Sequence, residues 1–280
     1  MQVAEIAWQH LTPANRVRVS TLLMLNPNYQ SWIAKVPTAK RNEVAFVMAA
    51  TWPDFIKTAA GYVNDTDTAP PGPASSQNIG YSDKFQHRYW HFIDTPFSTD
   101  GTALVQPVAP NAKTQIELFT AAIASTNASD DIKSYDLIWL EHLVGDVHQP
   151  LHATSRFSAA LPTGDRGGNS VALCVSPCKD ELHAFWDNVL GTSKNPTVAI
   201  TAPDKLAAPP AAAAAIADDQ VWITESFEAA KQFAYAAPVG PGSGPYTLDA
   251  AYKSKAKTEA KARIELAGVR LANLINANLK

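Results

Sequence analysis

The sequence predicts an all-α protein with long loops. Alanine is abundant and glycine is scarce, at 13 of 280 residues, and this composition favours helices. Proline stands where helices should begin and end, as at Thr12-Pro13 and Asn26-Pro27. No segment shows a convincing alternation of apolar and polar residues, which would indicate a half-buried strand. We therefore expect a helical fold without a convincing sheet.

Capping residues and prolines set the expected helix boundaries. Thr12 followed by Pro13 is a typical N-cap and first helical residue, and this helix should run to about Asn26. A second helix should start near Thr38 and kink or restart at Pro53. Further helices are expected at about 112–126, 131–148, 179–191, 211–235 and 247–278.

The remaining chain consists of loops within one expected domain, residues 1–280. Residues 61–85 and 149–178 lack helical periodicity, and loops of this length often carry function. No run of about 18 apolar residues suggests a membrane span. The first residues, "MQVAEIAWQHL", lack the pattern of a signal peptide, which we interpret as a truncated or mis-set N-terminus or a protein without a leader.

Charge and cysteine content restrict the classes of function. A formal net charge of −3 excludes a broad basic surface as the main source of nucleic-acid affinity. A polyanion would have to be attracted by bound cations or by a local basic cluster. Cys174 and Cys178 are close enough for a small-loop disulfide, but free thiols are equally compatible with the spacing.

The segment "HLVGDVHQPLH" at 142–152 carries the strongest chemical signal. His142 and Asp146 are four residues apart, so they share one face of a helix and can reach one cation. His148 is about 240° round the helix from His142 and points elsewhere. Pro150 should end the helix, which leaves His152 free to turn towards the pair or away from it.

The same spacing recurs further along the chain. His183 and Asp187 also share a helix face, while Asp54 follows Pro53 and His91 lies in an aromatic segment. Imidazole and carboxylate ligands suit zinc, and these residues are enough for two sites. For each pair, an ordinary helix salt bridge is the alternative, and spacing alone leaves both interpretations open.

With these residues in view, the chain resembles the zinc-dependent single-strand-specific nucleases. The segment "LIWLEHLVGDVHQPLH" carries the resemblance, and five further blocks follow the order of that family. They are "ATWPDFIK" at 50–57, "YWHFIDTP" at 89–96, "GDRGGNSVAL" at 164–173, "ELHAFWD" at 181–187 and "ARIELAGVRLANLIN" at 262–276. The resemblance implies a helical fold shared with bacterial zinc-dependent phospholipases C, with long loops over a metal cleft.

The resemblance also implies a ligand set for three zinc ions. One zinc would be held by Asp54, His91, His142 and Asp146, and a second by His152, His183 and Asp187. Asp146 would bridge the first zinc to a third, whose other ligands are an N-terminal Trp and a His that would lie before Met1. We therefore expect two complete sites in this chain.

Other positions acquire roles from the same resemblance. Asp54 and Asp146 are expected to be catalytic through the metals, and Lys57 stands where the family has an arginine over the phosphate. Phe92 corresponds to a platform on which a base stacks, Asp94 to a residue that binds base edges, and Asn169 to a phosphate contact. The family's histidine at the position of His148 is not a ligand, so we expect it to form structural hydrogen bonds.

The implied activity is hydrolysis of single-stranded DNA and RNA to 5′-nucleotides, with 3′-nucleotidase activity, by metal-activated hydroxide attack on phosphorus. One alternative is a phospholipase C, although that group carries Glu where this chain has Asp187 and lacks the base-stacking block. Another is a zinc-binding protein with impaired catalysis because third-metal ligands are absent. We expect a monomer, secreted or periplasmic as family members usually are.

Overall fold

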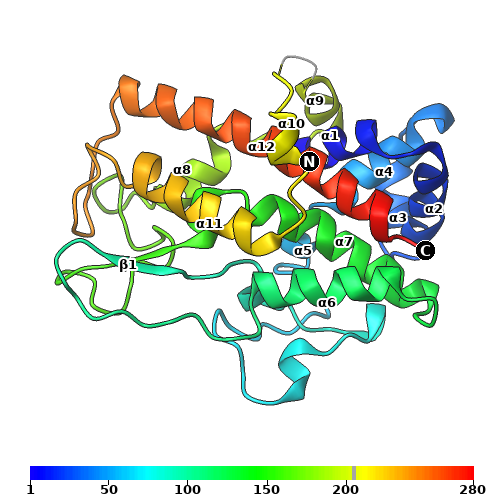
Figure 1. The fold of residues 1–280 in the computed structure, drawn as a ribbon, viewed down its shortest axis with the longest axis horizontal. Helices are drawn as coiled ribbons and strands as arrows, with labels where there is room; N and C mark the ends of the chain where they lie inside the picture. Colours follow the sequence, from blue (N-terminus) through cyan, green and yellow to red (C-terminus); the bar gives the residue numbers. More distant parts are fainter. Residues whose placement is uncertain (204–205) are drawn as a thin grey trace.

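A computed structural model describes residues 1–203 and 206–280, and it confirms the all-α prediction (Figure 1). The one sheet in the described residues has two short parallel strands, β1 (Pro96–Ser98) and β2 (Ser155–Phe157). These strands were not predicted, because each has only three residues and its partner lies far along the chain. The pairing aligns Phe97 with Arg156 and joins the segment after His91 to the loop that follows α7.

Helices make up most of the regular structure, and their bounds are as follows. The α-helices are α1 (Gln2–His10), α2 (Pro13–Leu23), α3 (Tyr29–Ile33), α4 (Arg41–Ala49), α5 (Trp52–Phe55), α6 (Ala112–Ala124), α7 (Asp130–Asp146), α8 (Leu182–Asn188), α9 (Pro196–Thr201), α10 (Ala211–Ala214), α11 (Asp219–Ala229) and α12 (Ala250–Asn278). The shorter turns are η1 (Thr38–Lys40), η2 (Pro73–Ser76), η3 (Gly80–Ser82), η4 (Arg88–Trp90), η5 (Pro150–Ala153) and the π-helical η7 (Ala230–Ala234).

Helix α7 lies at the centre of the molecule. Its residues 133–144 are all buried, and it packs against α2, α6 and α12 (Figure 1). A helix that is buried all round must be enclosed by other elements, and here large aromatic side chains such as Trp90, Phe119 and Trp139 fill the space around it. Because α7 ends at Asp146, its rigid last turn fixes where His142 and Asp146 lie.

A smaller apolar cluster supports α8. Leu182 and Trp186 pack with Ala230 of η7 and with Tyr252 near the start of α12. The indole Nε1 of Trp186 donates to the Tyr252 hydroxyl at 3.0 Å. This packing holds one face of α8 inward and leaves the face of His183 and Asp187 directed away from the cluster.

Several predicted helix boundaries are confirmed. Thr12 caps α2 by accepting from the Asn15 backbone N–H at 3.2 Å, and the helix break at Pro53 appears as the division between α4 and α5. The prediction of a single helix at 211–235 is wrong. The segment breaks between α10 and α11, because Asp218 starts α11 as an N-cap that accepts from the Gln220 N–H. The π-helical η7 then continues directly from α11.

Helix α1 was not predicted from the sequence. It packs along α12, where a Cβ atom at Gly268 would lie 2.5 Å from Cβ of Ile6. Close contact with α12 therefore accounts for its burial. The described residues contain no helix that is both long and apolar enough to cross a membrane.

The two cysteines are joined. Cys174 and Cys178 form a disulfide within the loop that leads into α8. The backbone around it pairs as Ala172 with Glu181, and Leu173 N–H donates to the Asp180 carbonyl at 2.9 Å. The disulfide therefore closes a small loop immediately before the helix that carries His183.

One carboxyl group is buried within the core without a cationic partner. Asp136 of α7 is fully buried and accepts a hydrogen bond from Asn78 Nδ2 at 2.8 Å. Burial raises the pKa of Asp136 to about 8 despite that hydrogen bond. The folded protein therefore holds a proton on Asp136 at neutral pH, whereas an unfolded chain releases it near pH 4.

Replacement of this carboxyl group tests that assignment. Between about pH 4 and pH 8 the folded state binds the extra proton, so wild-type stability should fall as pH rises, by up to about 1.4 kcal/mol per pH unit. Asp136→Asn keeps the shape and removes the titration. Urea unfolding of metal-free protein from pH 4.5 to 8 should therefore show a shallower decline for the variant. Parallel declines would contradict a raised pKa for Asp136.

Candidate metal centre

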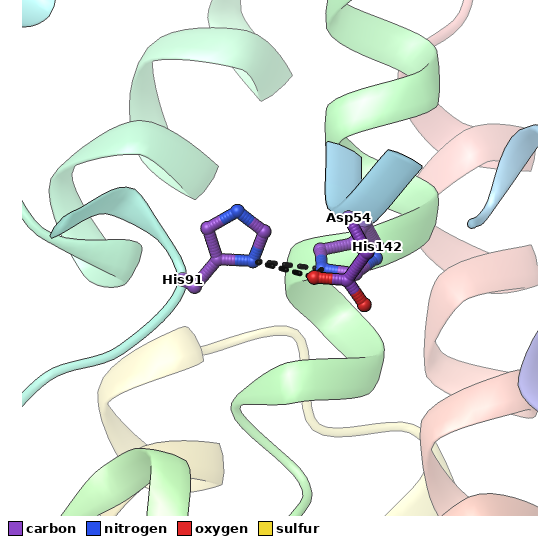
Figure 2. A group of neighbouring side chains, drawn as sticks. All are labelled: Asp54, His91 and His142. Carbon is purple, nitrogen blue, oxygen red and sulfur yellow. Dashed lines mark hydrogen bonds and ion pairs between the residues drawn. The ribbon is translucent and has the colours of Figure 1, made fainter. Parts of the chain in front are cut away.

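Four of the predicted ligands meet at the end of α7. Asp54 comes from α5, His91 follows η4, and His142 lies on α7; Figure 2 shows the three side chains converging. His142 Nε2 is 2.8 Å from His91 Nδ1, and Asp54 Oδ1 is 3.8 Å from both of these atoms. Asp146 Oδ2 completes the group, at 3.0 Å from His142 Nε2 and 3.1 Å from His91 Nδ1.

The other three predicted ligands form a second group. His152 lies in η5 beyond the break at Pro150, and its Nε2 is 3.3 Å from Oδ1 of Asp187. His183 Nε2 is 3.5 Å from Asp187 Oδ2, as their spacing on α8 predicted. One ligand atom from each of the three residues lies within 4.8 Å of the others.

Asp146 lies between the two groups. Its Oδ2 atom is 3.8 Å from His152 Nδ1, in addition to its short contacts with His91 and His142. The His152 imidazole is itself tied to the first group, because Nδ1 donates to the His91 carbonyl at 2.9 Å. The two groups therefore form one continuous cluster of imidazoles and carboxylates.

Backbone carbonyls orient three of the imidazole rings. His142 Nδ1 donates to the Ala50 carbonyl at 2.8 Å, and His183 Nδ1 donates to the Gly167 carbonyl at 2.8 Å. His152 Nδ1 donates in the same way to the His91 carbonyl. A ring whose Nδ1 carries the proton presents the lone pair of Nε2 to the cluster, which is the usual arrangement of a histidine that binds a metal. His91 is turned the other way and offers Nδ1, while its Nε2 is buried without a hydrogen-bond partner.

The cluster strongly favours positive charge. Burial acts against ionisation of Asp146, but the charges of His142 and His152 outweigh it, so the pKa of Asp146 lies well below its usual range. Burial opposes a charge on His152 as well, yet Asp146 and Asp187 raise its pKa to about 10. Burial, assisted by the charge of Lys57, lowers the pKa of His91 to about 3, so this ring is a neutral ligand at physiological pH.

The separations between ligand atoms match those around zinc in the second group and lie on either side of them in the first. Zinc bonds to nitrogen and oxygen measure about 2.0–2.2 Å, which in a tetrahedron places neighbouring ligand atoms roughly 3.3–3.6 Å apart. In the first group these atoms are 2.8–3.8 Å apart. In the second group the two imidazole–carboxylate contacts measure 3.3 and 3.5 Å. Ionised carboxylates and imidazole rings fixed by backbone carbonyls together make both groups suitable for zinc.

Glycine in the "DRGGN" loop makes the second group possible. Gly167 has φ +59°, and a Cβ atom there would lie 2.2 Å from the Leu151 carbonyl oxygen. A side chain at this position would push the loop away from η5. The loop could then no longer place the Gly167 carbonyl against His183.

Gln149 is a site residue that the sequence argument missed. Its backbone is extended, as expected for a residue before proline, and its side chain accepts from the Leu151 N–H. The same side chain donates through Nε2 to Asp187 Oδ1 at 2.8 Å. Gln149 thus links the turn that carries His152 to a predicted ligand on α8, and its position in "HQPLH" between two histidines was the available signal.

His148 lies outside the cluster, as expected from the helical geometry. Its Nδ1 donates to the Val144 carbonyl at 2.7 Å and its Nε2 accepts from Arg270 at 3.0 Å. Arg270 also donates two hydrogen bonds to Glu225, at 2.7 and 2.9 Å. A buried network therefore ties the last turn of α7 to α11 and α12.

Removal of Arg270 should destabilise the fold. Arg270→Met would leave His148 Nε2 without its donor and Glu225 without its closest cation, at a cost of about 3 kcal/mol. Arg18 forms an ion pair with Asp130 on the surface, so Arg18→Met should cost less than about 1 kcal/mol. Urea unfolding of both variants measures the difference, and equal losses would show that the buried network adds no stability.

The structure places the predicted substrate contacts around the cluster. Lys57 Nζ donates to Asp54 Oδ1 at 2.7 Å, and Phe92 is half-buried directly after His91. Burial and the charge of Asp165 raise the pKa of Asp94 to about 7, with Arg166 and His152 acting in the opposite direction.

Asn169 is engaged within its own loop. Its Nδ2 donates to the Arg166 carbonyl at 2.7 Å, so in this structure the amide N–H group is turned towards the loop backbone. Its role as a phosphate contact stays a prediction.

The helical fold brings two histidine–aspartate groups together at the end of its central helix, an arrangement that could hold metal ions. The family model described as S1/P1 Nuclease matches residues 1–280. The chain belongs to the S1/P1 nuclease family, which is the family of single-strand-specific nucleases that the sequence blocks resemble.

Curated relatives are plant endonucleases. Endonuclease 4 of Arabidopsis thaliana is 30% identical over 112 residues, which cover 36% of this chain and 35% of the relative. Endonuclease 2 of the same plant is 26% identical over 193 residues, covering 62% of this chain and 61% of the relative. The chain therefore matches less than two thirds of the length of these relatives.

Proposed function

We propose that this protein is a zinc-dependent nuclease that hydrolyses single-stranded DNA and RNA to 5′-nucleotides, with 3′-nucleotidase activity. The observation that carries the proposal is the continuous cluster in which Asp146 lies between two histidine–aspartate groups. Membership of the S1/P1 nuclease family supports it, as does the name endonuclease for the plant relatives.

The proposed ligands divide as the two groups do. One zinc is assigned to Asp54, His91, His142 and Asp146. A second is assigned to His152, His183 and Asp187. Zinc at these positions would supply a Lewis acid and an activated water for hydrolysis of a phosphodiester. The carbonyl-bound imidazoles and Gln149 keep the ligand atoms in place before the metal arrives.

Lys57 supplies a cation at the rim of this cluster. Its ammonium group is 2.7 Å from Asp54 and its side chain is mostly buried, so it is held close to the proposed site of the phosphate. A lysine provides charge without the bidentate fork of arginine, so we assign it the neutralisation of developing negative charge on the phosphoryl oxygens.

Phe92 and Asp94 are assigned to the base next to the cleaved bond. Stacking on an aromatic ring requires an unpaired base, which gives preference for single strands. Asp94, with a pKa of about 7, can accept from a base N–H as the carboxylate or donate as the acid near neutral pH. Asn169 is assigned to a phosphate, once its amide leaves the Arg166 carbonyl.

The setting of the protein is also a proposal. We infer one domain acting as a monomer in a secreted or periplasmic location. The Cys174–Cys178 disulfide supports an oxidising compartment, because such bonds persist there and are rare in reducing ones.

Metal removal and ligand substitution test the proposed function together. Chelation should abolish cleavage of denatured DNA, and added zinc should restore it. His183→Ala should lower kcat/KM by at least about 100-fold, because the second group loses one of three ligands. Zinc content by elemental analysis should fall by about one ion per chain in this variant.

His148→Ala serves as a comparison in which the lost histidine lies outside the cluster, so zinc content should not change. Duplex DNA and a soluble lecithin are the substrate controls. Turnover of lecithin without cleavage of denatured DNA would contradict a nuclease and indicate a phospholipase C. Cleavage that persists after complete zinc removal would contradict metal dependence.

A further inference from the structure

Two arginines share one aspartate beside the cluster. Arg88 Nε donates to Asp67 Oδ1 at 2.9 Å, and Arg166 Nη2 donates to Asp67 Oδ2 at 2.5 Å. We call these three residues the Asp67 clamp. Their side chains are 34%, 62% and 37% exposed for Arg88, Arg166 and Asp67, so the clamp is open to solvent. One carboxylate for two guanidinium groups leaves the clamp with a positive charge.

The Asp67 clamp adjoins both histidine–aspartate groups. Arg88 is three residues before His91 and belongs to η4, which leads directly into the first group. Arg166 is followed by Gly167, whose carbonyl accepts from His183 Nδ1 at 2.8 Å in the second group. The clamp is thus a local basic cluster next to the candidate metal centre, in a chain whose net charge is −3.

Asp67 is ionised, so the charge count holds. Partial burial would raise the pKa of Asp67, but the hydrogen bond and charge of Arg88 and the charges of Arg166 and Lys57 lower it below its usual value. Lys57 therefore also lies within electrostatic reach of the clamp. Among the described residues, Arg88 and Arg166 form ion pairs with Asp67 and Lys57 forms one with Asp54, while Asp94 and Glu181 lie within electrostatic reach of Arg166.

Backbone strain is concentrated at the clamp. Within the described residues, three non-glycine residues have positive φ: Thr66 at 68°, His87 at 48° and Arg166 at 55°. Thr66 directly precedes Asp67, His87 directly precedes Arg88, and Arg166 is itself a member. Side chains with a Cβ atom rarely adopt this conformation, and such residues gather where a ligand site needs a fixed geometry.

The Arg166 guanidinium is not needed to shape its own loop. The Arg166 backbone N–H donates to Ser155 Oγ at 3.2 Å, and Asp165 Oδ1 accepts from the Gly168 N–H at 3.2 Å. Asn169 closes the turn onto the Arg166 carbonyl. These backbone contacts would remain if the guanidinium were replaced, which separates a binding role from a structural one.

We propose that the Asp67 clamp binds a phosphate of the nucleic-acid strand that is not the one being cleaved, with Arg166 as the principal contact. The inference rests on the proposed nuclease function and adds a subsite to it. A phosphate diester presents oxygens that match a guanidinium fork, and Asp67 holds the two forks where those oxygens bind. Asp67 then competes with the strand for the guanidinium groups. Because the contact is to a phosphate, it does not depend on base sequence.

Arg166→Gln tests the contact with two substrates. A labelled oligothymidylate carries neighbouring phosphates, whereas bis(p-nitrophenyl) phosphate has only the phosphodiester that is cleaved. KM for the oligonucleotide should rise about tenfold with kcat within about twofold, and kinetics on the small diester should not change. The slope of log(kcat/KM) against log salt should become shallower by about 0.7, the value for one contact to a single strand. Arg166→Lys should recover part of the loss.

Asp67→Asn tests the competition. Loss of the carboxylate frees both guanidinium groups, so KM for the oligonucleotide should fall about threefold, and this gain should be absent when Arg166→Gln is also present. Arg18→Gln is the matched control, since Arg18 is also an arginine that pairs with an aspartate near the surface, through two hydrogen bonds to Asp130. That pair lies at the first residue of α7, roughly 24 Å along the helix from Asp146, and should leave KM unchanged.

Equal losses on both substrates, or lost zinc in Arg166→Gln, would overturn the proposal and assign Arg166 to the shape of the loop. An unchanged KM for the oligonucleotide would also overturn it. If wild-type protein cleaves neither substrate, the proposed function fails separately. Fluorescence anisotropy of the same oligonucleotide in zinc buffer then decides the clamp: about tenfold weaker binding by Arg166→Gln supports it, and equal binding refutes it.

Discussion

The position of the Asp146 carboxylate is the constraint on which the rest of the site depends. Its Oδ2 atom lies within 3.8 Å of imidazole nitrogens of three histidines. These are His91 after η4, His142 on α7 and His152 in η5. A carboxylate in such a buried place is stable only if positive charge surrounds it. The protein meets this condition by ending its central buried helix at Asp146, so that the segments carrying His91 and His152 must converge there.

The end of α7 has two different surroundings: a buried hydrogen-bond network on one side, which we call the rear, and solvent-exposed loops with strained backbone on the other, which we call the front. At the rear, Arg270, Glu225 and His148 tie the last turn of α7 to α11 and α12. At the front, Gly167 and its neighbours bring a loop against His183, and positive-φ residues stand beside the Asp67 clamp. Strain of this kind persists only where surrounding contacts over-determine the backbone. His87 has such contacts through its ring hydrogen bond to Asp83 and its stacking on Trp90, and Arg166 has one through its backbone N–H to Ser155 Oγ.

Local features of this site were predictable from the sequence, and contacts between distant segments were not. The i, i+4 pairs of His142 with Asp146 and His183 with Asp187 follow from helical periodicity alone, as does the separate direction of His148. The convergence of Asp54 and His91 on α7 has no local signal and was expected only from the family resemblance. The Arg166–Asp67 contact joins residues 99 positions apart and was missed.

The fold follows the same division. Thr12, Pro53 and Pro150 marked helix limits because capping and proline geometry act within a few residues. The Asp218 cap was overlooked, so one long helix was expected where α10, α11 and η7 stand. Helix α1 was missed because its stability comes from packing on α12, where Gly268 allows close approach.

The central claim is that two metal ions bind on either side of the region occupied by Asp146. Anomalous diffraction at the zinc edge, from crystals of zinc-loaded protein, tests it most directly. The account predicts one zinc peak bound by Asp54, His91, His142 and Asp146, and a second bound by His152, His183 and Asp187. A structure in which either group binds no zinc, with its histidines and aspartates paired only to one another, would contradict it.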